Sequence, residues 1–230
     1  MGDRPYVLLS CAVSIDGYLD DATADRLLLS NDTDFDRVDA VRAECDAILV
    51  GANTVRRDDP GLLVRSRARR DTRIAHGRPA SPVKVTLTGR GDLEPTARFF
   101  LTGDSEKIVY CATPATGEAR ERLDGAATVV DAGQPVDLRR VLADLARRGV
   151  RRLLVEGGGA VHTQFLATGL ADELHLVVAP IFVGNSRAPR FVGDGVFPWS
   201  TGNPATLAEV RQIGDVVLLR YALSERFGAA

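Results

Sequence analysis

Three consecutive glycines, Gly157 to Gly159, lie between an apolar run and a segment with the pattern of a helix. A strand that passes into a helix leaves several backbone N–H groups at the helix N-terminus without partners. Because glycine has no side chain, a phosphate could approach these groups closely, and the helix dipole would favour its charge. A tight turn with positive φ is the alternative. We interpret the run as a phosphate-binding segment.

The glycine run does not match the usual dinucleotide fingerprint. The pattern G-x-G-x-x-G would require glycine where His162 stands. An acidic residue should follow about 20 residues later, but Val177 and Val178 occupy that region. If a nucleotide binds here, we therefore expect a different fold to bind it.

Glu156 immediately precedes the glycines and has two interpretations. Acidic residues are stabilised near helix N-termini, so its role could be structural. It also follows the apolar run Leu153–Val155, at the carboxyl end of an expected parallel strand, where α/β sheets place ligand crevices. Since a carboxylate would repel a phosphate, Glu156 is better suited to a second ligand that carries N–H or O–H donors.

A second polar segment, Val50–Arg65, follows another buried apolar run and contains Asp58 and Asp59. Paired aspartates could form a metal site, a general acid–base pair or a turn, and Asp-Asp-Pro-Gly favours a turn. A metal site would need more oxygen or imidazole ligands nearby in the sequence, and none is evident. The basic stretch of residues 65–81 is expected to be an exposed loop, with docking of a phosphate as the alternative.

The elements that must position these residues follow a strand–helix alternation that ends in strands. A helix with cap residues Ser30 to Asp32 and an amphipathic helix capped by Asp137 are expected between strands. This order predicts an α/β fold with a mostly parallel central sheet, flanking helices and an antiparallel C-terminal edge. No linker or repeat is evident, so we predict one domain over residues 1–230. The expected strands cover residues 6–14, 47–51, 83–89, 107–112, 127–133, 151–156, 172–184, 205–213 and 215–222.

The composition of the chain argues against several classes of protein. The 230-residue chain is 45% hydrophobic with a net charge of −2, which argues against a nucleic-acid or anionic-membrane partner. No apolar run approaches the roughly 20 residues that a membrane helix needs. Three widely spaced cysteines indicate neither disulfides nor a metal knuckle. Together with a start that lacks a signal-peptide pattern, these features predict a cytoplasmic protein without a metal.

Three stretches, Ser14–Gly17, Val41–Arg65 and Leu153–Gly184, together resemble the reductase family of riboflavin biosynthesis. This family comprises the reductase half of the bacterial bifunctional deaminase-reductase and the stand-alone archaeal and fungal reductases. The resemblance implies a fold like that of dihydrofolate reductase and a homodimer. It also implies NADPH-dependent reduction of a 5-amino-6-(ribosylamino)pyrimidine 5′-phosphate to the ribitylamino product. The zinc deaminase signature is absent, so no deaminase activity is expected.

The resemblance also implies roles for individual residues, although no residue is an obvious general acid. The phosphate cradle of the family corresponds to the glycine run with the residue after it, and further positions contact the cofactor or hold the pyrimidine. The implied cofactor-binding residues are Val13, Thr54, Asp58, Gly157, Gly158, Gly159 and Ala160, and the implied substrate-binding residues are Arg42, Leu62, Arg65 and Glu156.

Two residues depart from the family pattern. Leu27 stands where a serine would touch the substrate, and Tyr18 stands where lysine or arginine is usual. Loss of a hydrogen-bonding hydroxyl can change which substrate is accepted. Two alternatives therefore stay open: a reductase of the same fold that acts on dihydrofolate, another pterin or a secondary-metabolite pyrimidine, and a non-catalytic NADP-binding protein.

Overall fold

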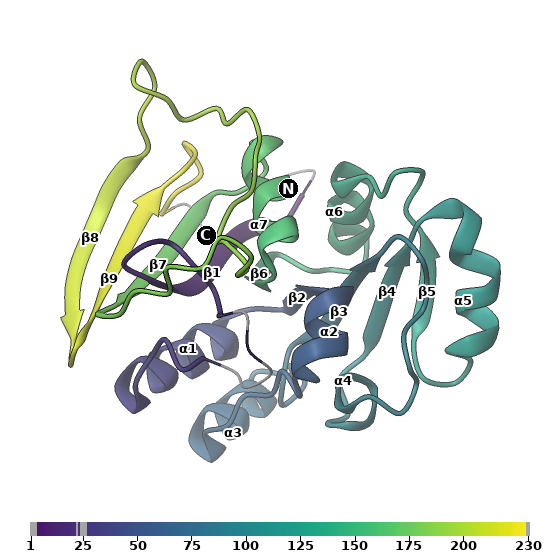
Figure 1. Ribbon diagram of the computed structural model, residues 1–230. Helices are drawn as coiled ribbons and strands as arrows, with labels where there is room; N and C mark the ends of the chain where they lie inside the picture. The colour runs from purple at the N-terminus through teal and green to yellow at the C-terminus, as the bar shows by residue number, and fades with distance from the viewer. Residues whose placement is uncertain (1–3, 22, 24–26, 229–230) are drawn as a thin grey trace. The chain divides into compact units, whose positions relative to one another are not determined.

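The structure, a computed structural model, describes residues 4–21, 23 and 27–228 (Figure 1). The chain forms two compact units, which are described separately. The first unit consists of Met1–Pro5 and Asp39–Leu154, and the second consists of Tyr6–Val38 and Val155–Ala230. Two elements, helix α1 (Asp32–Glu44) and strand β6 (Arg152–Gly157), carry the chain from one unit to the other.

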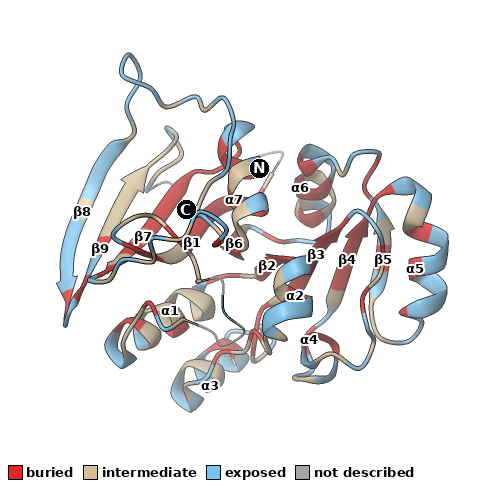
Figure 2. Ribbon diagram, in the orientation of Figure 1, coloured by how far each residue is buried: buried red, intermediate tan, exposed pale blue. Residues whose placement is uncertain are grey.

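Four parallel strands form the sheet of the first unit, in the order β5-β4-β3-β2. Strand β2 is a continuous apolar run, as expected for a strand that is covered on both faces, whereas β3 alternates apolar residues with the buried polar residues Lys84, Thr86 and Thr88. Every residue of β2 is buried, and Figure 2 shows β3 and β4 buried along most of their length. The strands are β2 (Ala47–Gly51), β3 (Val83–Thr88), β4 (Lys107–Cys111) and β5 (Thr128–Asp131).

Helix α6 shows how the sequence determines a helix in the first unit. The Asp137 side chain accepts a hydrogen bond from the backbone N of Arg139 at 2.8 Å, as an N-cap should. Its apolar stripe is buried, and the Tyr110 hydroxyl of β4 donates to Asp144 at 2.8 Å. The helices of this unit, besides the end of α1, are α2 (Ala52–Asp58), α3 (Arg67–Ala75), α4 (Arg98–Leu101), α5 (Thr116–Arg122) and α6 (Leu138–Arg147), with a 3₁₀ turn, η1, at Thr113–Ala115.

The expectation of an exposed loop over residues 65–81 was wrong, because α3 lies within it. Ser66 caps this helix by accepting a hydrogen bond from the N–H of Arg69. Arg73 is 1% exposed and donates to the carbonyl oxygens of Ala43, Cys45 and Pro79 at 2.7, 2.7 and 2.8 Å. A guanidinium bound to backbone carbonyls thus takes the place of the apolar stripe that sequence patterns detect.

The second unit combines parallel and antiparallel strands in the order β1-β7-β9-β8. Strand β1 pairs with β7 in parallel, and β9 pairs antiparallel with β7 and with β8. The predicted mostly parallel α/β fold with antiparallel C-terminal strands is confirmed. The strands are β1 (Tyr6–Ser14), β7 (Glu173–Ala179), β8 (Thr206–Ile213) and β9 (Val216–Ala222), and helix α7 (Gly159–Ala167) follows β6.

An apolar cluster forms the core of part of this unit. Its buried members are Leu29, Val177, Ala179, Ile213, Val216 and Leu218. Strand β8 is exposed along nearly its whole length, as Figure 2 shows, and its Leu207 and Val210 are 50% and 60% exposed. None of the helices described in the structure has the length and apolar character that a membrane crossing requires.

Candidate active site

The three glycines lie at a strand-to-helix junction in the second unit, as predicted. Gly157 is the last residue of β6, Gly158 is the N-cap, and Gly159 is the first residue of α7. The N–H groups of Val161 and His162 donate to the carbonyl oxygen of Gly158 at 2.9 and 3.1 Å. The first N–H groups of any α-helix lack the intrahelical acceptors that later ones have, and the helix dipole is positive at this end, so the N-terminus of α7 favours an anion.

The glycines at the two ends of this run are required for different reasons. Gly157 has a φ of +148°, and apart from its chain neighbours no heavy atom of the described residues lies within 4 Å of the position of an added β-carbon. A β-carbon on Gly159 would instead overlap the carbonyl oxygen of Arg190. Gly157 therefore supplies a conformation that other residues rarely adopt, whereas Gly159 makes room for the protein's own backbone.

Arg190 belongs to the loop that follows β7, residues 181–191, and Asp16 anchors that loop. Its carboxylate accepts hydrogen bonds from the backbone N of Val183 at 3.0 Å and of Gly184 at 2.7 Å. The Ser14 hydroxyl donates to Asp16 at 2.6 Å. The hydrogen bond from Ser14, followed by those from the two amides, lowers the pKa of Asp16 to about 2. Asp16 therefore holds the loop as a carboxylate at neutral pH.

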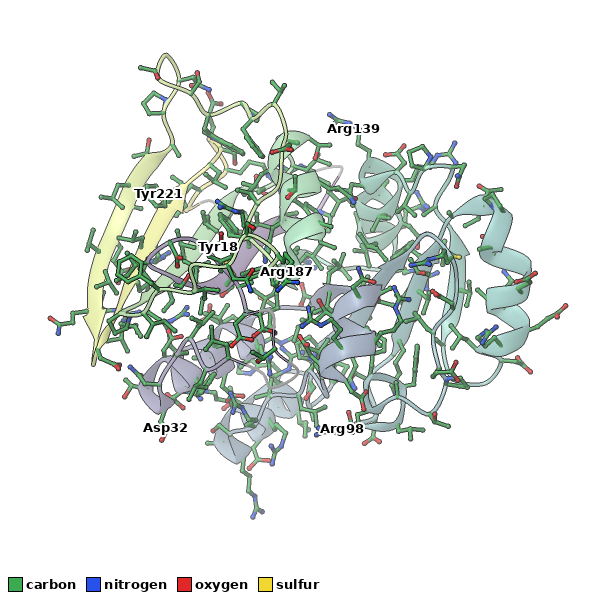
Figure 3. All side chains as sticks on the ribbon, in the orientation of Figure 1. Tyr18, Asp32, Arg98, Arg139, Arg187 and Tyr221 are labelled. Atoms are coloured by element: carbon green, nitrogen blue, oxygen red, sulfur yellow. The ribbon has the colours of Figure 1, made fainter. Side chains whose placement is uncertain are left out.

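Tyr18, which Figure 3 labels, fixes the other end of the same loop. Its side chain is buried, and its hydroxyl accepts a hydrogen bond from Nη2 of Arg190 at 3.0 Å. The Arg190 guanidinium also lies over the Tyr18 ring, with Cζ 4.8 Å from the ring centroid, which is a cation–π distance. Backbone hydrogen bonds from Leu19 to Pro189 and from Phe191 to Gly17 complete the attachment. This departure from the family pattern therefore has a structural role.

Two further predicted residues lie in the second unit. Val13 is 4% exposed, near the end of β1, and its register partner is Val178 of β7. Glu156 is half-buried and is the residue before Gly157 in β6. The second unit thus carries Val13, Glu156 and the run from Gly157 to Ala160, whose last residue is exposed.

The other predicted residues, Arg42, Thr54, Asp58, Leu62 and Arg65, lie in the first unit. Thr54 and Asp58 belong to α2, and Asp59 ends that helix in the left-handed region with a φ of 41°. Of the two aspartates expected in a turn, Asp58 is instead the last residue of α2, and Asp59 is its C-cap. In the part of the chain that the structure describes, no group of three or more His, Cys, Asp or Glu side chains could hold a metal ion.

Leu62 has an unusual backbone conformation for its residue type. It is 4% exposed and has a φ of 48°, in the left-handed region that residues other than glycine rarely occupy. The Arg42 guanidinium donates to the carbonyl oxygen of the next residue, Leu63, at 3.1 Å, and the N–H of Val64 donates to Ser81 Oγ at 3.0 Å. Such strain persists only where surrounding contacts hold it, and it is common at functional sites.

Sequence reasoning missed Asp39, a residue of α1 that binds the backbone of this loop. Asp39 is 2% exposed, and its carboxylate accepts hydrogen bonds from the backbone N of Arg65 and of Ser66. The only signal in the sequence was its position on α1 one turn before Arg42, which implies that the two side chains share a face. That spacing does not show which loop the face contacts.

His162 and Leu27 are explained by packing. His162 is fully buried, with its ring centroid 5.5 Å from that of Phe191, and neither ring nitrogen has a hydrogen-bond partner among the described residues. Burial lowers the pKa of His162 to about 4, so the ring is neutral. Leu27 is partly buried and packs against the apolar cluster that contains Val177 and Leu218.

Comparison with known proteins agrees with the family resemblance seen in the sequence. The model of the RibD C-terminal domain matches residues 5–219. The 2,5-diamino-6-ribosylamino-4(3H)-pyrimidinone 5′-phosphate reductase of Archaeoglobus fulgidus is 37% identical over 225 residues, which cover 97% of this chain and 99% of that protein.

Solved structures show the same architecture. RibD of Acinetobacter baumannii superposes with a TM-score of 0.78 at 25% identity, over 96% of this chain and 58% of the longer RibD chain. Dihydrofolate reductase of Enterococcus faecalis, solved with NADP(H), has a TM-score of 0.50 at 11% identity over 94% of this chain and 95% of that one. At such low identity this last similarity concerns the fold alone.

Proposed function

The chain belongs to the family of the RibD C-terminal domain, and on this basis we propose that it reduces 2,5-diamino-6-ribosylamino-4(3H)-pyrimidinone 5′-phosphate in riboflavin biosynthesis. The observation that carries this proposal is the 37% identity to the Archaeoglobus reductase, which extends over nearly the full length of both chains. The chain is therefore an oxidoreductase that acts on a pyrimidine 5′-phosphate.

A reductase of this family uses a nicotinamide cofactor, and we propose NADPH. When bound, the cofactor supplies a hydride, and the protein supplies alignment. The α7 N-terminus fits its phosphates because the helix dipole favours an anion there and, apart from chain neighbours, no heavy atom of the described residues lies within 4 Å of the position of a β-carbon on Gly157. The proposed cofactor-binding residues are Val13, Thr54, Asp58, Gly157, Gly158, Gly159 and Ala160.

For the substrate, we propose Arg42, Leu62, Arg65 and Glu156. Arginine guanidinium groups suit the 5′-phosphate because they can bind it through two N–H groups. A carboxylate would repel that phosphate, so Glu156 suits the amino or hydroxyl donors of the pyrimidine and its sugar. The strained backbone at Leu62 supports a functional role for its loop.

A spectrophotometric assay tests the activity by following the loss of NADPH absorbance. The purified protein is offered the pyrimidine phosphate with NADPH or NADH, and dihydrofolate with NADPH. We expect turnover with the pyrimidine phosphate and a preference for NADPH. Turnover with dihydrofolate alone would instead establish the pterin reductase, and cofactor binding without turnover would establish the non-catalytic protein. Leu27, the residue that favoured another substrate, packs against an apolar cluster and gives no positive reason for a pterin.

We also propose that the protein is a cytoplasmic homodimer. The edge strand β8 exposes Leu207 and Val210, and an exposed apolar edge strand is a surface that proteins usually cover. Light scattering of the wild type and of Val210→Lys tests the dimer. We expect the mass of two chains for the wild type and a shift toward one chain for the variant, whereas a wild-type monomer would refute the proposal.

A further inference from the structure

The last turns of α1 carry a buried carboxylate that accepts hydrogen bonds from the loop before α3 and from the first turn of α3. Asp39 accepts from the backbone N of Arg65 at 2.5 Å, from the backbone N of Ser66 at 3.0 Å and from Nη1 of Arg69 at 3.0 Å. Its exposed fraction is 2%. A carboxylate at this depth is stable only when its oxygens are hydrogen-bonded and its charge is paired, and these three donors meet that requirement.

The same loop is held by side chains at nearly every backbone group from residue 63 to residue 66. Besides the bonds from Asp39, Arg42 donates to the carbonyl oxygen of Leu63 and Ser81 accepts from the N–H of Val64. The Arg70 guanidinium donates to the carbonyl oxygens of Val64 and Arg65 at 3.0 and 2.6 Å. The main chain on both sides of the Arg65 side chain is therefore fixed.

Asp39 contacts the main chain of Arg65 and the side chain of Arg69. It binds the backbone N of Arg65, and its ion-pair partner is the guanidinium of Arg69. Burial raises the pKa of Asp39, but the amides of Arg65 and Ser66 and the Arg69 guanidinium outweigh burial and lower it. Asp39 therefore holds Arg65 through its main-chain N–H group, while the ion pair of Asp39 is with Arg69.

We infer that Asp39 is a positioning residue for the phosphate of the substrate: it fixes the Arg65 main chain so that the Arg65 guanidinium meets the phosphate in one geometry. This inference rests on the proposed function, in which Arg65 holds the substrate. Preorganised contacts gain affinity because the cost of ordering the side chain and its loop is met during folding.

Asp39→Asn in the full-length chain tests the inference, because asparagine keeps the shape but offers one oxygen acceptor to two amides. The KM is measured for the pyrimidine 5′-phosphate and for the same compound without its phosphate, together with the Kd of NADPH. We expect the KM for the phosphorylated compound to rise about tenfold to a hundredfold, as for small misplacements of a binding group. The KM for the dephosphorylated compound and the Kd of NADPH should change less than about twofold.

Two further variants make the result specific. Asp71→Asn is the matched control, because Asp71 forms an ion pair with Arg67 on α3 at 3.7 Å in which both side chains are largely exposed; its kinetics should equal those of the wild type. Arg69→Met keeps the Asp39 carboxylate and removes its charge partner, so it serves if Asp39→Asn does not fold. We expect a smaller rise in KM that is again confined to the phosphorylated compound.

Equal loss with both pyrimidines, or an equal loss of NADPH affinity, would show that Asp39 is merely structural and would overturn the inference. Unchanged kinetics of Asp39→Asn would overturn it as well. Failure of the wild type to reduce the pyrimidine phosphate would refute the proposed function itself, and the two failures are therefore distinguishable.

Discussion

The carbonyl oxygen of Arg190 lies closer to the position of a β-carbon on Gly159 than the 3.0 Å that real β-carbon contacts respect. The loop after β7 and the first residue of α7 are thus in backbone contact. Gly159 is required by this contact, whatever the helix N-terminus binds.

Gly159→Ala should destabilise the protein because the added methyl group must displace the Arg190 backbone. We expect the free energy of unfolding to fall by roughly 1–3 kcal/mol, as for other overpacked sites. Urea denaturation measures the change. The control is Gly117→Ala in α5, where no other part of the described chain comes within 4 Å of the β-carbon and a gain of about 0.5–1 kcal/mol is expected. Equal stability of Gly159→Ala and the wild type would contradict the contact.

Glu156→Gln should weaken the use of the substrate and leave the cofactor largely unaffected. Hydrogen bonds to charged groups are worth about 1.5–3 kcal/mol, so loss of the charge should raise the KM for the pyrimidine about tenfold to a hundredfold. Steady-state kinetics and NADPH titration measure the two effects. A comparable loss of NADPH affinity would move Glu156 from the substrate to the cofactor.

His162→Leu should be neutral or stabilising at pH 7, because it removes a buried ring whose nitrogens lack partners among the described residues. A buried unsatisfied polar group costs about 1–3 kcal/mol, so we expect a gain of roughly 1 kcal/mol. NADPH oxidation by the variant should match that of the wild type. A large loss of activity would instead assign His162 a role toward a ligand.

The same residue should make the wild type sensitive to acid. Its pKa is about 4 in the folded protein, against an ordinary value of 6.5, so the folded state binds fewer protons than the unfolded state. Above pH 6.5 this difference in proton binding has no effect on the free energy of unfolding. As the pH falls toward 4, the free energy of unfolding falls by roughly 3 kcal/mol in total, because the unfolded state gains a proton that the folded state does not. Urea denaturation at pH 7 and at pH 4 measures this loss. The urea midpoint should fall less between the two pH values for His162→Leu than for the wild type.

Asp16→Asn should loosen the loop of residues 181–191. The variant loses one of the two carboxylate oxygens that accept the amides of Val183 and Gly184. We expect faster hydrogen exchange at these two amides and faster cleavage by trypsin after Arg187 and Arg190, both of which lie in the loop.

The control for the loop is Asp194→Asn, which changes an exposed aspartate a few residues beyond it. Its exchange and cleavage rates should equal those of the wild type. If Asp16→Asn also behaves as the wild type, the carboxylate does not hold the loop.

Strands β1 and β2 could be predicted from the sequence because both are buried and apolar along most of their length. The prediction of a strand over residues 6–14 matches β1, and that over residues 47–51 matches β2. The strand expected over residues 172–184 ends earlier, at Ala179, because Pro180 follows it. Helix α3 was missed because Arg73 binds carbonyl oxygens from distant parts of the chain, and no local pattern encodes such partners.

The candidate site was predictable to a smaller extent. The glycine run and Glu156 are adjacent in the sequence, so the strand-to-helix junction that they form could be predicted from the sequence. Asp39 could not be found in this way, because its partners at Arg65 and Ser66 lie 26 and 27 residues away. The different requirements at Gly157 and Gly159 also needed the structure, since a glycine looks the same whether it serves a positive φ or a backbone contact.

The Arg73 guanidinium has a consequence for the construction of chimeric enzymes. Because it bonds to carbonyl oxygens of Ala43, Cys45 and Pro79, the α3 segment cannot be exchanged between relatives as though it were a surface insertion. A transplanted segment without this arginine would remove the guanidinium donor from the carbonyl oxygens of Cys45 and Pro79. Exchange points for recombination should therefore keep residues 43 to 79 in a single block.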